Sequence, residues 1–245
     1  MPPKHASAGP LIGIVAGEPS GDLLGGALVQ ALAKRSPGAR FAGIGGPQMI
    51  AAGVESLFPM EKLSVRGYVE VLRHYREIIG IRRSLRDIFL AERPAVFIGI
   101  DAPDFNLGLE RQLKARGVRT VHYVSPSIWA WRESRAAKIA RSADRVLCLL
   151  PMEPPIYARY GVEAPFVGHP LASRMLVPMA VADARGRLDL PPKGRVLALM
   201  PGSRGGEIDR LGPVFITAAL QIANAVPGLR VVAPMANRRC FEQFG

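Results

Sequence analysis

Acidic residues stand at or near the ends of two short apolar stretches, where they could act as acids, bases or ligands. Glu18 follows shortly after the stretch 11–16, and Asp101 comes directly after 96–100. A charged residue just after a buried parallel strand lies at the rim of the sheet, and in open α/β sheets that rim holds the ligand crevice. A carboxylate there can serve as a general base. Asp101 is the better candidate base, with helix capping as its alternative, whereas Asp104 fits a helix cap.

The turn at 16–26 is rich in glycine and opens a helix predicted from about residue 22 to 34. Glycine permits close backbone approach, and a helix N-terminus suits an anion. The turn contains neither the Gly-x-Gly-x-x-Gly dinucleotide fingerprint nor the Lys and Ser/Thr of a P-loop. Its simplest interpretation is that Ser20 or Asp22 caps the helix, and a binding role is the alternative.

Both tryptophans of the chain, Trp129 and Trp131, lie in one loop at 125–132. Their flat apolar faces suit sugars or acyl chains as well as packing beneath a long loop. Basic residues then recur at near-helical spacing as far as Arg145. This pattern indicates either a solvated helix face or a surface that attracts phosphate or anionic lipid.

The segment 68–90 combines an apolar side with five arginines. Val69, Ile78 and Ile81 add apolar surface outside a narrow stripe. Ordinary packing of a surface helix is one interpretation, and contact with an anionic membrane through these three residues is the other.

A second glycine-rich turn, at 201–206, stands between an apolar stretch and a predicted helix. Arg204 at the start of this helix, with Ser203 and Glu207 beside it, is a candidate phosphate contact. The four histidines and two cysteines are scattered without ligand spacing, so no metal site is predicted.

Short apolar stretches alternate with amphipathic ones, which predicts a parallel sheet covered on both faces. Strands are expected at 11–16, 40–44, 96–100, 120–124, 146–150 and 165–167. Residues 171–194 interrupt this alternation of strands and helices. They are predicted to be a linker between a first domain, 1–170, and a second domain that begins at 195. That second part has a strand at 195–200, a helix near 211–225 and a strand at 230–233. One β-α-β unit cannot enclose its own core, so we expect the second domain to be incomplete.

The composition, with 49% hydrophobic and 21% charged residues, favours a folded chain over a disordered one. No targeting or membrane-spanning segment is convincing, and the two cysteines fit a reducing cytoplasm. A net charge of +12 favours anionic partners. Nucleic acid is one such class, but no recognisable binding module or basic patch with interleaved aromatics supports it, and no nucleic-acid partner is predicted.

Six motifs, taken together and in order, resemble the lipid-A-disaccharide synthase family. They are GEPSGD (17–22), GIGGP (43–47), DAPDFN (101–106), SPSIWAW (125–131), FVGHP (166–170) and PGSR (201–204) followed by Glu207. The resemblance covers the chain from about residue 11 to its end. It implies a GT-B fold, with two Rossmann-like domains, and argues against related UDP-sugar glycosyltransferases and epimerases that share that fold.

The resemblance also implies the chemistry. The family condenses UDP-2,3-diacylglucosamine with 2,3-diacylglucosamine 1-phosphate (lipid X), with inversion, to a disaccharide 1-phosphate and UDP. Asp101 would be the base that deprotonates the acceptor 6-hydroxyl. The substrate-binding residues would be Glu18, Ser20, Gly21, Asp22, Asn106, Trp129, Ser203, Arg204 and Glu207.

The family resemblance further implies partners and a place. No cofactor is expected. The chain would work in the cytoplasm, peripherally on the anionic inner-membrane surface of a Gram-negative cell, and a homodimer is an open alternative to a monomer. Family members run well beyond residue 245, so we expect this chain to be truncated at its C-terminus and inactive by itself.

Overall fold

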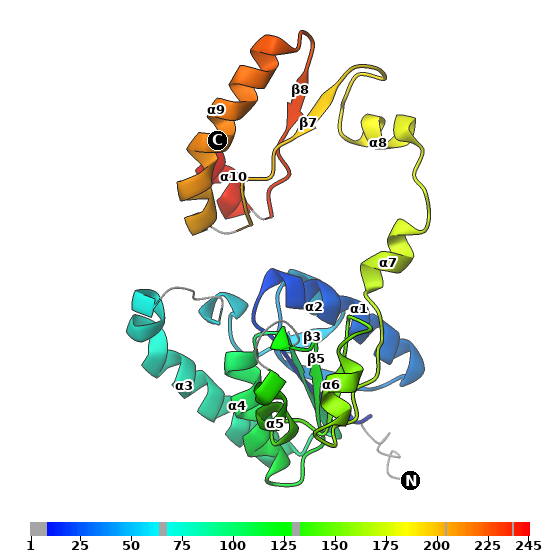
Figure 1. The fold of residues 1–245 in the computed structure, drawn as a ribbon. Coiled ribbons are helices and arrows are strands. Elements are labelled where there is room, and N and C mark those ends of the chain that lie inside the picture. The colour runs from blue at the N-terminus through cyan, green and yellow to red at the C-terminus, as the bar shows by residue number, and fades with distance from the viewer. Residues whose placement is uncertain (1–8, 64–67, 129–132, 204, 237) are drawn as a thin grey trace, which may run out of the picture. The chain divides into compact units, whose positions relative to one another are not determined.

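A computed structural model describes the chain at residues 9–63, 68–128, 133–203, 205–236 and 238–245. It divides into two compact units, Met1–Leu176 and Val177–Gly245 (Figure 1). Trp129 and Arg204, both named above as candidate substrate contacts, lie outside the described residues. Two short helices, α7 (Pro170–Met175) and α8 (Val181–Arg187), occupy much of the segment expected to be a linker.

The first unit is built on a parallel sheet of six strands in the order β3-β2-β1-β4-β5-β6. The strands are β1 (Leu11–Ala16), β2 (Arg40–Ile44), β3 (Val54–Ser56), β4 (Val96–Ile100), β5 (Thr120–Tyr123) and β6 (Arg145–Leu147). The chain therefore builds outward from β1 in one direction, then crosses back to place β4 on the other side of β1. This reversal between β1 and β4 is a topological switch point.

Successive residues of each strand face opposite sides of this sheet, and helices bury both sides. In β1, Ile14 belongs to the core under α1 (Pro19–Arg35) and α2 (Pro47–Ala51), and Val15 belongs to the core on the other face. That second face is covered by α3 (Tyr68–Glu92) and α4 (Pro103–Lys114), as Figure 1 shows. Burial on both faces explains why these strands read as continuous apolar stretches.

A third, smaller core lies beside β6. Here η3 (Glu133–Arg135), α5 (Ala136–Ala140) and α6 (Pro154–Ala158) follow in close succession. The strand expected at 165–167 does not form, and Phe166 instead makes an isolated bridge to Cys148. The short strand β3 and the turn η1 (Met60–Lys62) were not expected.

The inner face of α3 corrects part of the membrane prediction. Ile81 is 7% exposed and packs in the core with Leu85 and Phe89. Ile78 is half-buried against the same core. The prediction that Ile81 contacts a membrane is therefore wrong, because this side chain points at the sheet. Position 69 falls in the part of α3 whose side chains are not described.

The second unit is a parallel pair of strands, β7 (Val196–Ala198) and β8 (Arg230–Val232), joined by α9 (Gly205–Ala225) and followed by α10 (Arg238–Phe244). Several apolar side chains of this unit are exposed, among them Val214 at 63% and Leu220 at 61%. The two strands and three helices described in this unit, including α8, bury too little apolar surface to cover them. Over the described part of the chain, no helix combines the length and apolar character needed to cross a bilayer.

Candidate functional site

The carboxyl ends of β1 and β4 meet at the switch point of the sheet. Ala16 and Ile100, the last residues of the two strands, are paired in register. The turns that follow also touch, since a Cβ on Gly17 would lie only 2.8 Å from the Cβ of Ala102. Glycine at position 17 thus leaves room for the side chain of Ala102 in the facing turn. Asp101 stands directly after β4, at the place where ligands bind in open α/β sheets.

The backbone at this edge is strained. Asp101 and Ala102 have φ values of 51° and 43°, and Val124, after the neighbouring strand β5, has a φ of 78°. Left-handed conformations are uncommon for residues other than glycine, and for β-branched valine they are true outliers. Each costs about 1–3 kcal/mol, and such residues cluster at functional sites.

Hydrogen bonds from the adjoining strand ends hold these strained residues in place. The Asp101 N–H donates to the carbonyl of Tyr123 at 2.9 Å. The Val124 N–H donates to the carbonyl of Leu147 at 3.1 Å. The two turns therefore continue the sheet by one residue each before they leave it.

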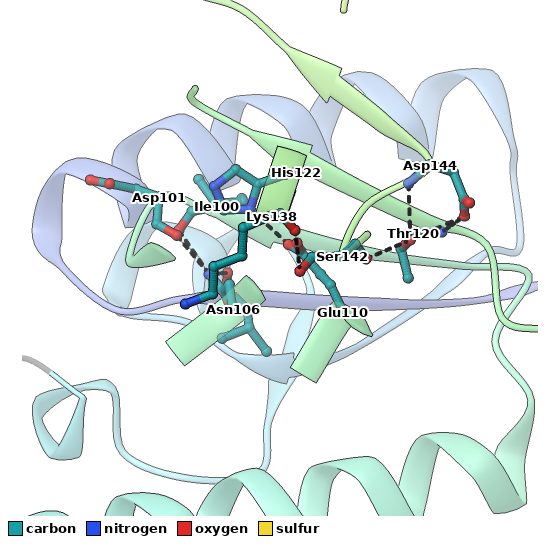
Figure 2. Close-up of polar contacts among 10 residues, drawn as sticks. Ile100, Asp101, Asn106, Glu110, Thr120, His122, Lys138, Ser142 and Asp144 are labelled. Atoms are coloured by element: carbon teal, nitrogen blue, oxygen red, sulfur yellow. Dashed lines mark hydrogen bonds and ion pairs between the residues drawn. The ribbon is translucent and has the colours of Figure 1, made fainter. Parts of the chain in front are cut away.

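The side chain of Asn106 anchors the turn at Asp101 through hydrogen bonds to backbone carbonyls. Its side-chain amide donates to the carbonyls of Asp101 at 2.9 Å, and of Ile100 and Val15 at 3.3 Å each (Figure 2). Asn106 is fully buried in the first turns of α4. The expectation that Asn106 touches substrate is corrected accordingly: its amide is occupied by the backbone at the strand ends, and its role is to position Asp101.

Asp22 also has a structural role. Its carboxylate accepts hydrogen bonds from the N–H groups of Gly46 and Met49 at 2.9 Å each, and of Gln48 at 3.0 Å. Asp22 is 3% exposed. It therefore caps α2 from a distance, neither capping its own helix α1 nor facing a substrate as expected. This contact holds the GIGGP turn against α1.

The remaining residues of the first turn differ in exposure. Glu18 is the N-cap residue of α1 in an extended conformation, and its side chain makes no capping bond. Glu18 is half-buried and Ser20 is exposed, so both remain candidates for substrate contact. Gly21 is buried, and a Cβ there would lie 3.4 Å from the carbonyl oxygen of Ile100. Gly21 thus packs α1 onto β4.

A buried acid–imidazole pair lies on the same face of the sheet as Asn106. Glu110 on α4 and His122 on β5 are fully buried, with Oε1 and Nδ1 2.7 Å apart (Figure 2). Burial raises the pKa of Glu110, and His122 opposes that rise. Gly99 makes the pair fit, because a Cβ there would lie 2.1 Å from Glu110 Oε1.

A second group of polar side chains lies between the Glu110–His122 pair and β6. The Thr120 hydroxyl hydrogen-bonds Asp144 Oδ2 at 3.0 Å and the carbonyl of Ser142 at 3.3 Å. Lys114, at the end of α4, pairs with Asp144 Oδ1 at 3.1 Å. The bonds of Thr120, shown in Figure 2, tie β5 to the turn between α5 and β6, and the Lys114–Asp144 pair ties α4 to the same turn.

Sequence reasoning did not single out Gly99, Glu110 or His122. One signal was present: Asn106 and Glu110 stand four residues apart, so they share a face of α4 with the apolar residue Leu113. A charged residue on an apolar helix face needs a buried partner. The partner, His122, could not be identified from spacing.

The glycine-rich turn of the second unit is organised by Glu207. Its carboxylate accepts the Ser203 N–H at 2.9 Å. Gly202, with a φ of 148°, lies so close that a Cβ would be 2.5 Å from the Cβ of Glu207. Glu207 thus shapes the start of α9, and the predicted contact of Ser203 with a phosphate stays a prediction.

Metal and thiol chemistry find little support in the described residues. Among them, no three His, Cys, Asp or Glu side chains gather closely enough to hold a metal ion. Cys148 is fully buried, as expected for a core thiol, and burial raises its pKa to about 12. A thiol of that pKa is not a nucleophile near neutral pH.

A sequence model of one protein family, described as lipid-A-disaccharide synthetase, matches residues 12–245. The chain belongs to the lipid-A-disaccharide synthase family. The resemblance expected from the six motifs is therefore confirmed.

Curated members of the lipid-A-disaccharide synthase family are similar over nearly the whole chain. Lipid-A-disaccharide synthase of Xanthomonas campestris is 54% identical over 231 residues, which is 94% of this chain and 53% of that protein. The enzyme of Xylella fastidiosa is 55% identical over 231 residues, or 94% of this chain and 60% of that protein. The chain thus spans little more than half the length of these synthases.

A solved structure shows the fold. UDP-GlcNAc 2-epimerase from Neisseria meningitidis, bound to UDP-GlcNAc, matches 96% of this chain and 68% of its own, with a TM-score of 0.60 and 9% identity. At that identity the likeness bears on the fold alone. It confirms the predicted α/β, GT-B type fold class of this synthase-family chain.

Proposed function

We propose that this chain provides the acceptor side of an inverting glycosyltransferase. The reaction joins UDP-2,3-diacylglucosamine and 2,3-diacylglucosamine 1-phosphate to a disaccharide 1-phosphate and UDP. The observation that carries the proposal is the position of Asp101 on a strained turn at the switch point between β1 and β4. The family membership supports the substrates.

The proposed reaction is a single displacement at the anomeric carbon of the donor. A carboxylate oxygen of Asp101 takes the proton of the acceptor 6-hydroxyl, and the oxygen attacks the anomeric carbon of the donor sugar. The bond from that carbon to the diphosphate oxygen breaks, and UDP leaves with the electron pair. Attack from the face opposite the leaving group inverts the anomeric centre. A positioned base contributes about 10²–10⁴ in rate.

The chain's own residues support this role of Asp101. The three bonds from Asn106 hold the strand ends that carry it. Glu18, at the N-cap of α1, and Ser20, in the first turn of that helix, follow the adjacent strand β1 and would contact the acceptor. Arg204 would contact the donor's diphosphate or the acceptor phosphate, with Ser203 and Glu207 as further substrate-binding residues of the same turn, and protein cations would offset the leaving-group charge.

The proposal is tested by a chimera in which this chain continues into the C-terminal part of the Xanthomonas campestris synthase. With both acylated substrates it should release UDP and disaccharide in equal amounts, and the new linkage should have the β configuration. UDP release in the absence of acceptor, or retention of the donor's configuration, would contradict the proposed reaction. The 245-residue chain by itself should form no disaccharide, because the second unit leaves its apolar residues uncovered.

We further propose that the chain acts peripherally at the cytoplasmic face of the inner membrane. The net charge of +12 and the acylated substrates support this location. Because Ile81 is buried, the proposed apolar contact rests on the other two residues of the prediction, Val69 and Ile78. The protein should sediment with vesicles that contain anionic lipid and be partly released by salt. Val69→Ser should weaken sedimentation, and equal recovery with neutral and anionic vesicles would count against the proposal.

A further inference from the structure

A pocket of about 220 Å³ lies along one face of α4. This face adjoins the face of the helix that packs on the sheet. The residues of α4 that line it are Pro103, Asp104, Leu107, Gly108 and Arg111. Their spacing is that of one continuous helix face over two turns. The pocket therefore begins at the first residue of α4, two positions after Asp101, and extends away from the sheet edge.

The walls of this pocket are strongly basic. Arg82 of α3, Arg111 of α4, and Arg135 and Lys138 of the η3–α5 segment all line it, against the single carboxylate of Asp104. Within the described parts of the chain, Arg111, Arg135 and Lys138 form no ion pair with a carboxylate. Like charges this close repel one another, so an anion between them would be stabilised.

The guanidinium of Arg82 lies close to α4 at Gly108, where the lack of a side chain leaves room for it. A Cβ on Gly108 would lie 2.6 Å from Nη1 of Arg82. The guanidinium also lies over the ring of Phe105, with Cζ 5.2 Å from the ring centroid, and Nη2 donates to the carbonyl of Asp104 at 3.2 Å. Burial lowers the pKa of Arg82, but arginine remains charged at any ordinary pH. An arginine fixed in this way is pre-organised to bind an anion.

The rest of the lining is apolar. Leu107, Ile128 and Ile139 lie beneath the cations, with Ser142 as an added polar group (Figure 2 shows Lys138 and Ser142). Pockets for drug-sized ligands measure about 300–1,000 Å³, so this one suits a smaller group. A phosphate on a sugar ring fits both its size and its mixed lining, whereas a whole nucleotide does not.

We propose that this pocket, which we call the α4 pocket (lined by Arg82, Arg111, Arg135 and Lys138), binds the phosphomonoester of the sugar acceptor. This inference rests on the proposed function and adds the residues that select a phosphorylated acceptor. Because the pocket begins at Pro103, two positions after Asp101, the sugar would lie along the first turn of α4, with its hydroxyl toward Asp101 and its phosphate in the pocket. Arginine forks and a lysine ammonium are the side chains that bind phosphate best.

Titration calorimetry of glucosamine 1-phosphate with the 245-residue chain tests this inference, because it measures binding and requires no activity. The double variant Arg135→Gln/Lys138→Gln removes two pocket cations. Its matched control is Lys34→Gln/Arg35→Gln, which removes two exposed cations from the last turn of α1. A second variant and its control test Arg82. In Gly108→Ala the new methyl group would displace the Arg82 guanidinium, whereas in Gly80→Ala, on α3, it would meet no atom within 4 Å.

The expected result is a loss of affinity of about tenfold or more in the double variant, from charge-assisted bonds. Gly108→Ala should weaken binding severalfold, and both controls should bind as the parent chain does. Equal affinity in all five proteins, or no binding to the parent, would overturn the inference.

Three further ligands separate the sources of the phosphate. Inorganic phosphate should bind more weakly than glucosamine 1-phosphate, and equal binding would overturn the commitment to a sugar phosphate. UDP binding should be unchanged in the double variant, and its selective loss would reassign the pocket to the donor. Vesicles of phosphatidic acid should bind both double variants alike, and a loss confined to the pocket variant, with sugar-phosphate binding intact, would reassign the pocket to a membrane lipid.

These outcomes are distinct from failure of the proposed function. If the chimera makes disaccharide but the pocket variants bind glucosamine 1-phosphate normally, only the assignment of the pocket fails. If the parent chain binds the sugar phosphate through the pocket but the chimera makes no disaccharide, the reaction is wrong and the pocket stands.

Discussion

The side-chain amide of Asn106 donates a hydrogen bond of 2.9 Å to the carbonyl of Asp101, the residue at the left-handed turn after β4. The same amide also donates to the carbonyls of Val15 and Ile100, near the carboxyl ends of the neighbouring strands β1 and β4. One buried side chain therefore ties α4 to the edge of the sheet where a ligand would bind. The strain at Asp101 persists because this anchor, together with the bond to Tyr123, holds it.

Asn106→Ala should destabilise the chain by about 1–3 kcal/mol, because it leaves buried carbonyls without their donor. Asn106→Asp keeps the size but replaces the donor with an acceptor, so it should be no more stable than the alanine variant near neutral pH. Urea unfolding of the three proteins measures both differences. An aspartate variant as stable as the parent would show that the hydrogen bonds of Asn106 contribute nothing.

Gly99→Ala should cost about 1–3 kcal/mol through overpacking, since its methyl would collide with the Glu110 carboxylate. Gly80→Ala is the matched control: it adds the same methyl in open space on a helix, where alanine is favoured by up to about 1 kcal/mol. Thermal unfolding should therefore shift in opposite directions for the two variants. A shift of the same sign and size would contradict the close contact between β4 and α4.

Glu110→Gln should reveal a pH dependence. Because burial raises the pKa of Glu110, the folded protein keeps this proton at pH values where the unfolded chain, with a pKa near about 4.3, has lost it. The stability that Glu110 contributes is then full below that value and is lost as pH rises through the folded pKa. In urea unfolding, the glutamine variant should gain on the parent as pH rises above the pKa of Glu110 in the unfolded chain. A parent that instead gains stability over the same pH range relative to the glutamine variant would contradict a raised pKa of Glu110.

Limited proteolysis should cut the chain first between residues 177 and 194. That segment is largely exposed, and its one helix, α8, has no buried residue. The fragment that remains should contain the six-stranded sheet and should persist, because the two principal cores lie within it. First cuts inside α3 or α4 would contradict this order of stability.

Three strands of the sheet could be predicted to the residue. The strands β1, β2 and β4 occupy 11–16, 40–44 and 96–100 as expected, because strands buried on both faces are continuous apolar stretches with polar or glycine boundaries. The three-residue strand β3 was missed, since a strand this short has no readable pattern. Helix α9 begins six residues earlier than expected, at Gly205, because its first turn is polar and rich in glycine.

The candidate site was predicted only in part. Asp101 could be placed at the sheet edge because its position depends only on where β4 ends. Asp22 and Asn106 are the last residues of the motifs GEPSGD and DAPDFN. Both side chains point inward and bind backbone groups that are distant in sequence. Whether a polar side chain faces a ligand or the backbone depends on tertiary neighbours, which spacing along the chain does not encode.

The most direct test of the account is the turnover of the chimera carrying Asp101→Asn, measured as disaccharide formed with both substrates saturating. Loss of a general base should lower kcat by about 10²-fold or more. The matched variant Asp87→Asn, at an exposed site on α3, should keep the parent rate, and urea unfolding should show both variants to be folded. A folded Asp101→Asn chimera with near-parental kcat would remove Asp101 from the mechanism and contradict the central claim.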